Sequence, residues 1–202
     1  MKYTGTGANA TVGHGLSAAP EIRIIKGLSS GTSETQNWFV WVAGIGTNNE
    51  MILNGTGTPA YTASVMNQNQ TPTSTTFPIG SDGRVNQSGK DYIAYCWHSV
   101  TGYSKIGTYE GNDSLTGPTV TTGFRPRFVL IKNVDSAGNS WAIIDSQRST
   151  SDPRNKSLFP SSSASEYTNT GGLTFTDTGF EVDSTDNFIN GLNNTHIYMA
   201  FK

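Results

Sequence analysis

Short apolar clusters separated by long polar stretches run the whole length of the chain. Each cluster is rich in β-branched and aromatic residues and is bounded by Gly, Asn, Ser or Pro, the pattern typical of β-strands. The clusters are Glu21 to Lys26, Trp38 to Val42, Met51 to Leu53, Tyr92 to Trp97, Phe128 to Lys132, Trp141 to Ile144 and Ile197 to Phe201. The one helix candidate is a weak one around Ala60 to Met66.

Several clusters are apolar at nearly every position, which favours strands that are covered on both faces over strands with one solvated face. Turn-forming residues lie between clusters, at Asp82-Gly83, Ala137 to Asn139 and Thr178-Gly179, as short hairpin connections require. The pattern therefore predicts an all-β fold with antiparallel sheets.

The two halves of the chain align with each other at an offset of roughly 103 to 108 residues. The matched positions, first half before second, are Tyr3 and Tyr109, Pro20 and Pro126, Ile22 to Lys26 and Phe128 to Lys132, Trp38 and Trp141, Phe77 and Phe175, and Tyr92 to Trp97 and His196 to Phe201. A period near 100 residues is too long for a solenoid repeat. We therefore expect a duplicated β-sandwich, with two similar antiparallel sandwich units, residues 1–101 and 102–202, packed together.

Composition and charge exclude several classes of function. Charged residues make up only 14% of the 202 residues, and Gly, Ser, Thr and Asn together make up about 44%. The formal net charge is −2 and no block of Lys or Arg occurs, so we expect no binding to nucleic acid. No stretch approaches 18 apolar residues, so we expect no membrane insertion. Cys96 is the only cysteine and cannot form a disulfide within the chain.

The densest cluster of charged residues is the segment DSQRSTSDPR, which contains Asp145 and Arg148. This pair follows a strand whose counterpart in the first half reads Val42 to Ile45, so the shared fold does not require it. Asp145 and Arg148 are therefore candidate ligand contacts. The competing interpretation, which is the commoner arrangement, is an Asp–Arg pair that closes a loop.

We expect no metal and no organic cofactor. Carboxylates at Asp177, Glu181, Asp183 and Asp186 could supply oxygen ligands, but they lack the spacing of a calcium loop and fit a solvated hairpin better. The three histidines lie about 80 to 100 residues apart, with no second Cys or His at the spacing of a zinc site.

Carbohydrate binding is a further hypothesis, because sugar rings stack on exposed aromatic faces while amide and hydroxyl groups bind their hydroxyls. The candidate contacts, which lie in polar, loop-like surroundings, are Tyr61, Tyr103, Tyr109, Tyr167, Asn112 and Asp113. The alternative is that these tyrosines cover the ends of the sandwiches.

One series of segments resembles a known family. In order, it reads GHGLSAAPEIRIIK, FPIGSDGRVNQSGKDYIAYCW, GYSKIGTYEGN, GPTVTTGFRPRFVLIKN, DSQR, DTGFEV and THIYMAFK. The series is similar to a two-part module of marine bacteriophage virion proteins, often tail-fibre or related surface proteins. The resemblance implies an all-β component of the phage particle surface with no recognised enzymatic activity, and it supplies no site residues.

Three functions remain open. The first is a virion surface protein, a tail fibre or fibre-associated module, that acts in host attachment and binds a host surface glycan. The second is a capsid-decorating or purely architectural virion protein. The third, which we disfavour, is a glycan-degrading enzyme, since no acidic pair falls in matching loops. We expect contacts with other virion subunits and a homo-oligomer, a trimer if the chain belongs to a fibre, because the apolar strands exceed what one sandwich face requires.

Overall fold

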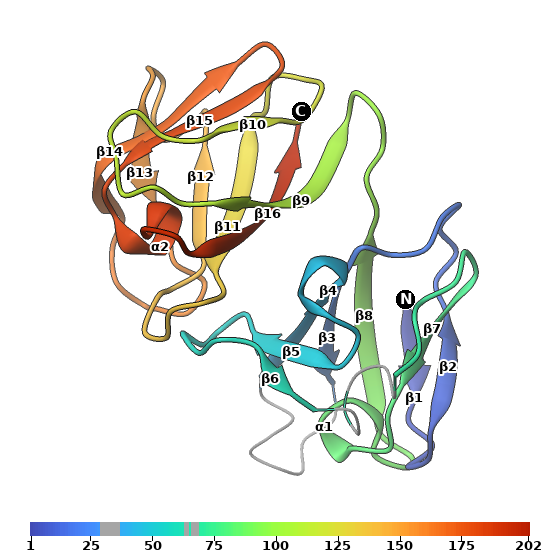
Figure 1. Cartoon of the computed structure of the whole chain (residues 1–202). Coiled ribbons are helices and arrows are strands. Elements are labelled where there is room, and N and C mark those ends of the chain that lie inside the picture. Colours follow the sequence, from blue (N-terminus) through green and yellow to red (C-terminus); the bar gives the residue numbers. More distant parts are fainter. Residues whose placement is uncertain (29–36, 63–64, 66–68) are drawn as a thin grey trace. The chain divides into compact units, whose positions relative to one another are not determined.

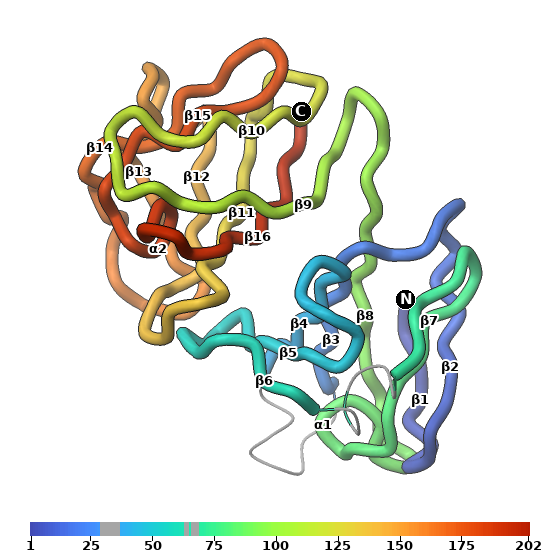
Figure 2. The backbone as a smooth tube through the Cα atoms, viewed as in Figure 1, coloured from blue at the N-terminus to red at the C-terminus, as the bar shows by residue number. Residues whose placement is uncertain are grey.

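The computed structural model describes residues 1–28, 37–62, 65 and 69–202 (Figure 1). The fold is nearly all β, with 45% of the described residues in strands, 6% in helices, and antiparallel sheets. The chain forms two compact units, residues 1–53 with 59–98 and residues 54–58 with 99–202 (Figure 2).

The first unit is built on a six-stranded sheet with a two-stranded sheet beside it. In spatial order the large sheet consists of β1 (Lys2–Thr4), β8 (Asp91–Trp97), β3 (Ile22–Gly27), β4 (Trp38–Val42), β5 (Asn49–Ile52) and β6 (Ala60–Tyr61). The small sheet pairs β2 (Ala10–Gly13) with β7 (Thr76–Ile79). The 3₁₀ helix η2 (Ala43–Ile45) follows β4, and the one-turn helix α1 (Gly83–Asn86) lies between β7 and β8. Alternate residues of the large sheet, such as Ile25, Phe39 and Ala94, form a core with Phe77 and Ile79 of the small one.

The second unit is a sandwich of two four-stranded sheets. The first sheet has the order β12 (Ala142–Asp145), β11 (Phe128–Asn133), β16 (Thr195–Phe201) and β9 (Ser104–Glu110). The second has the order β10 (Thr119–Thr121), β15 (Gly179–Ser184), β14 (Tyr167–Thr176) and β13 (Arg154–Ser157). The one-turn helix α2 (Asn187–Asn190) connects β15 to β16.

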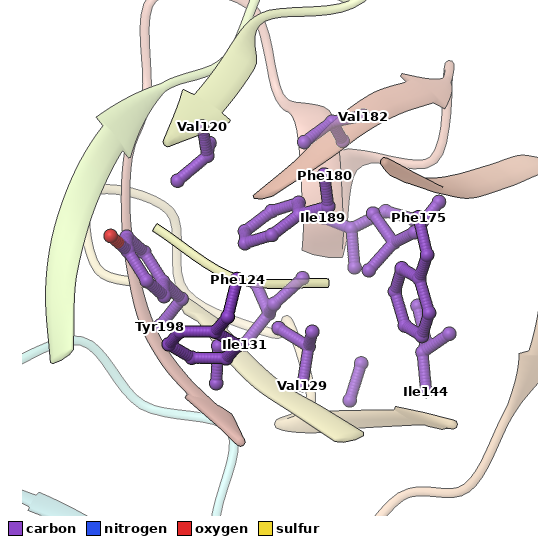
Figure 3. Close-up of a cluster of buried hydrophobic side chains, with 13 residues drawn as sticks. Val120, Phe124, Val129, Ile131, Ile144, Phe175, Phe180, Val182, Ile189 and Tyr198 are labelled. Carbon is purple, nitrogen blue, oxygen red and sulfur yellow. The ribbon is translucent and has the colours of Figure 1, made fainter. Parts of the chain in front are cut away.

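Side chains from both sheets meet in the core of the second unit (Figure 3). Val129 and Ile131 of β11 lie opposite Phe175 of β14 and Phe180 of β15, and all four are at most 1% exposed. Burial of this apolar surface is the main stabilising contribution to such a sandwich, at about 25 cal/mol per Å².

The strand registers confirm that the two units repeat one arrangement. Ile22 of β3 pairs with Val42 and Trp97, and Phe128 of β11 pairs with Asp145 and Phe201. Trp97 and Phe201 are therefore equivalent, as the sequence alignment predicts. The same comparison gives Tyr3 paired with Tyr92 in the first unit and Tyr109 paired with His196 in the second.

The aligned prolines also occupy equivalent places. Pro20 and Pro126 are both buried, and each lies two residues before its strand, β3 or β11. Proline cannot donate a hydrogen bond to a sheet, so a position just outside the strand is the one that it tolerates.

The second layers of the two units differ, and the alignment was wrong there. Phe77 pairs with Val12, and Phe180 pairs with Val120, so Phe77 corresponds to Phe180 and not to Phe175. Phe175 belongs to β14, for which the described part of the first unit has no counterpart strand.

All seven strands predicted from the apolar clusters are present. Thr178 lies in the turn between β14 and β15, but Asp82 does not form a hairpin: it caps α1 and accepts a hydrogen bond from the Arg84 N–H. Ala60 and Tyr61 form a strand and not a helix. Of the rest of that helix candidate, residues 63, 64 and 66 lie outside the described residues.

Candidate functional site

Three aromatic side chains form a row on the large sheet of the first unit: Trp38 of β4 with Tyr95 and Trp97 of β8, called the aromatic row below. They lie on the face opposite the core, because their strand neighbours Phe39 and Ala94 point into it. The pleat places alternate residues of a strand on one face, which is why Tyr95 and Trp97 are neighbours.

The rings of the aromatic row are nearly parallel to one another. The Trp38 and Tyr95 centroids lie 6.2 Å apart with an interplanar angle of 26°, and those of Tyr95 and Trp97 lie 6.2 Å apart at 18°. Since rings in face-to-face contact are separated by only about 3.5–4.0 Å, this spacing means that the rings are displaced sideways and cover each other only in part. Tyr95 is 41% exposed, and both tryptophans are partly exposed.

A cation lies at one end of the aromatic row. The ammonium group of Lys26 is 5.7 Å from the centroid of the Trp38 ring, within cation–π range. Partial burial lowers the pKa of Lys26. The row therefore combines apolar ring faces with a hydrogen-bond donor, the two elements that recognise a sugar ring and its hydroxyl groups.

The second unit keeps the backbone of this face but not the aromatic row. Met199 occupies the place of Tyr95, as its pairing with Leu130 shows, and is 6% exposed. Trp141, the counterpart of Trp38, is buried. Lys132, the counterpart of Lys26, is buried and donates to the Asn133 and Asn139 carbonyls at 2.8 and 2.9 Å. The aromatic row is thus a property of one unit and not a requirement of the repeated fold.

Three of the tyrosines predicted from the sequence are exposed but scattered. Tyr61 is 71% exposed in β6 of the first unit, while Tyr103, before β9, and Tyr167, in β14, are 61% and 41% exposed in the second. Tyr167 packs on Phe159 and Phe188, with ring centroids 5.7 and 5.8 Å away. Within the second unit, Tyr103 adjoins β9 of one sheet while Tyr167 lies in β14 of the other.

Tyr109 is not a loop residue, and that expectation was wrong. It lies in β9, stacks on His196 with ring centroids 5.0 Å apart, and packs against the core. Its hydroxyl donates to the Ile189 carbonyl at 2.6 Å, and burial raises its pKa well above the ordinary value. Tyr109 therefore holds α2 against the sheet.

Asn112 and Asp113 lie together in the loop after β9, but their polar groups bind the protein itself. The Asn112 N–H donates to Asn190 Oδ1 at 2.9 Å, and its amide donates to the Thr116 carbonyl at 3.1 Å. Asp113 has a φ of 50° and donates its N–H to the Asn190 carbonyl at 2.9 Å. These contacts shape a loop and leave little of Asn112 for a ligand.

Asp145 and Arg148 form the loop-closing pair that was the competing interpretation of this cluster. Their ion-pair distance is 2.8 Å, and Asp145 Oδ1 accepts from the N–H groups of Gln147 and Arg148 at 2.9 Å each. Burial raises the pKa of Asp145, but these hydrogen bonds and the guanidinium outweigh it, so the pKa lies below its usual value. Arg148 also donates to the Ile143 carbonyl at 2.8 Å.

The acidic group near β15 is divided among separate partners. Asp177 lies 3.6 Å from Arg125, Asp183 accepts from the Thr174 hydroxyl at 2.6 Å, and Asp186 accepts from the Thr170 N–H at 2.7 Å. Among residues 1–28, 37–62, 65 and 69–202, no group of three or more His, Cys, Asp or Glu side chains is placed to hold a metal ion. Over the same ranges, no helix has both the length and the apolar character to span a bilayer.

The sequence did not reveal the aromatic row, because its three members lie within apolar clusters that predict buried strands. The available signal was the alternation of Tyr95 and Trp97 within β8, but only the register of β3 and β4 brings Trp38 to them. No curated protein and no solved structure matches the chain. One family model matches residues 1–202, and the chain accordingly belongs to the family described as "Domain of unknown function (DUF7483)".

Proposed function

We propose that this protein is a bacteriophage virion surface protein, of a tail fibre or associated with one, that attaches to a host surface glycan through the aromatic row. The observation that carries the proposal is the row of the exposed Tyr95 and the partly exposed Trp38 and Trp97, with Lys26 beside it. The virion assignment has its support in the series of segments that resembles phage surface modules.

The chemistry of the aromatic row favours a sugar over other ligands. A pyranose ring has apolar C–H faces that pack on aromatic rings, while its hydroxyls need donors and acceptors at the rim. Lys26 supplies one donor, and the Tyr95 hydroxyl, on a 41% exposed side chain, supplies both a donor and an acceptor. A protein partner would need an interface of about 1,000 Å² or more, far larger than three rings.

A binding surface of this kind gives weak affinity for one sugar, so attachment depends on many copies. Linking several sites on one particle raises the overall affinity by about 10² to 10⁴ without any new contact. The expected homo-oligomer and the repeated display of virion subunits would provide these copies.

The experiment probes an array of bacterial surface polysaccharides with beads that display the purified protein at high density. We expect retention on a subset of the polysaccharides that is lost in the double variant Y95A/W97A. A matched Y103A variant removes an exposed tyrosine outside the aromatic row and should leave the retention unchanged. Retention that survives the double variant, or no retention on any polysaccharide, would contradict the proposal.

A further inference from the structure

A second feature of the structure, independent of the aromatic row, is a positively charged pocket in the second unit. Its volume is about 280 Å³, just below the 300–1,000 Å³ range of most ligand pockets. The residues that define this basic pocket are Arg125, Arg127, Arg154, Lys202, Pro126, Ser146 and Phe175. We propose that it binds the carboxylate or sulfate group of a small anionic ligand.

The deepest cation of the basic pocket is fixed in place. The side chain of Arg154 is only 8% exposed, and its guanidinium carbon lies 5.6 Å from the centroid of the Phe175 ring. Arg154 donates to the Ser149 carbonyl at 2.5 Å and lies 3.0 Å from Asp152. A guanidinium that is held by its neighbours loses little entropy when it binds an oxyanion.

The remaining cations lie at the mouth of the basic pocket. Arg125 is tied to Asp152 at 3.1 Å and faces Asp177 at 3.6 Å. Arg127 and Lys202 are exposed, and within the described residues their charged groups make no hydrogen bond or ion pair. The four cations outnumber the two carboxylates, so the pocket keeps a positive charge.

The duplication shows that this charge is not needed for the fold. The Arg127 N–H donates to the Phe201 carbonyl at 2.7 Å, and at the same place in the first unit the Glu21 N–H donates to the Trp97 carbonyl at 2.8 Å. The first unit therefore carries Glu21 where the second carries Arg127. By the same register, Ala19 stands at the place of Arg125 and His98 at that of Lys202.

The exposed groups of the basic pocket indicate the chemistry of its ligand. Phe175 and Pro126 also line the pocket, but Phe175 is only 1% exposed and Pro126 is buried, so a ligand meets the cations and not an apolar wall. Arginine binds carboxylate and sulfate through paired N–H groups, and the exposed Arg127 can offer such a pair. The pocket therefore recognises the anionic group of its ligand.

The inference is tested by NMR titration of the ¹⁵N-labelled protein with glucuronate at 0.15 M ionic strength, with glucose, acetate and sulfate as comparison ligands. We expect glucuronate, acetate and sulfate each to shift the amide signals of Arg127, Ser146 and Lys202, and glucose to give no shift. Shifts of the same size with glucose, or no shift with any of the three anions, would overturn the inference.

The matched variants are R127E, which installs the first unit's residue, and K105E, which makes the same charge change outside the pocket lining. We expect R127E to weaken glucuronate binding at least about 10-fold and K105E to leave it within about 2-fold. Equal effects of the two variants, or no binding by the wild type, would overturn the inference. The Y95A/W97A variant should bind glucuronate normally, so failure of the aromatic-row proposal is distinguishable from failure here.

Discussion

Asn86 in the first unit and Asn190 in the second occupy the same place and make the same hydrogen bonds. Asn86 Oδ1 accepts from the Thr6 N–H at 2.8 Å, and Asn190 Oδ1 accepts from the Asn112 N–H at 2.9 Å. Each amide nitrogen donates to two backbone carbonyls, at distances between 2.6 and 3.0 Å. Both side chains are fully buried, so each asparagine ties the loop after the first strand of its unit to the segment around the short helix.

Replacement of either asparagine by alanine should destabilise the protein strongly. N86A and N190A each leave three backbone groups without their partner, and one of these, the carbonyl of Gly80 or of Ser184, is buried. A buried unsatisfied group costs about 1–3 kcal/mol, so we expect a loss of about 1–3 kcal/mol. Urea unfolding followed by circular dichroism measures the change. The control is N9A, at an exposed position, which should change the free energy of unfolding by less than about 0.5 kcal/mol. If N86A, N190A and N9A changed the free energy of unfolding by similar amounts, the structural role of the two buried asparagines would be refuted.

Two equivalent glycines should be equally intolerant of a side chain. A Cβ on Gly5 would lie 2.2 Å from the Gln87 carbonyl oxygen, and one on Gly111 would lie 2.3 Å from the Gly191 oxygen. G5A and G111A should therefore each cost about 1–3 kcal/mol or more, because the obstacle is backbone. Nothing lies within 4 Å of a Cβ on Gly57, so G57A should be nearly neutral. Thermal melts of the three variants and the wild type measure the differences. A stable G5A or G111A protein would show that the two loops are not held as described.

The acid sensitivity of the second unit should depend on His196. Burial lowers its pKa below the ordinary value of 6.5, so below pH 6.5 the unfolded chain takes up a proton that the folded chain does not. The free energy of unfolding should consequently fall as the pH drops from 6.5 towards the lowered pKa. H196F cannot titrate, and its unfolding free energy should fall less steeply over that range. The exposed-position variant N9A is the control and should keep the wild-type slope. An unchanged slope in H196F would contradict the argument.

Much of the strand framework could be predicted because apolar clusters mark strands that are buried on at least one face. The polar strands could not: β14 reads YTNTGGLTFT and β9 reads SKIGTYE, and such Ser, Thr and Gly-rich segments resemble loops. The buried Asn86 and Asn190 gave no signal in a chain so rich in asparagine, a residue type that generally favours turns.

Prediction of the candidate sites required knowledge of the strand register even more than prediction of the fold did. Sequence alone placed Tyr109 in a loop, and its partners His196 and Ile189 come from a strand and a helix more than 75 residues away. The aromatic row likewise needs three strands in a particular alignment, and the basic pocket combines residues from before β11, from β13 and from after β16. The Asp145 and Arg148 cluster was recognised, but its neighbours Arg127 and Lys202 were not, because they are isolated in sequence.

The most direct test of the proposed attachment is the affinity of the wild-type protein for the polysaccharide selected on the array. Isothermal titration calorimetry of the wild type, Y95A/W97A and Y103A provides it, since each stacked aromatic ring should contribute about 0.5–1.5 kcal/mol beyond its buried area. We predict at least a 10-fold weaker affinity for Y95A/W97A, with the Kd of Y103A within 2-fold of the wild type and all three proteins folded by circular dichroism. A Y95A/W97A protein that is folded and binds as tightly as the wild type would contradict the account.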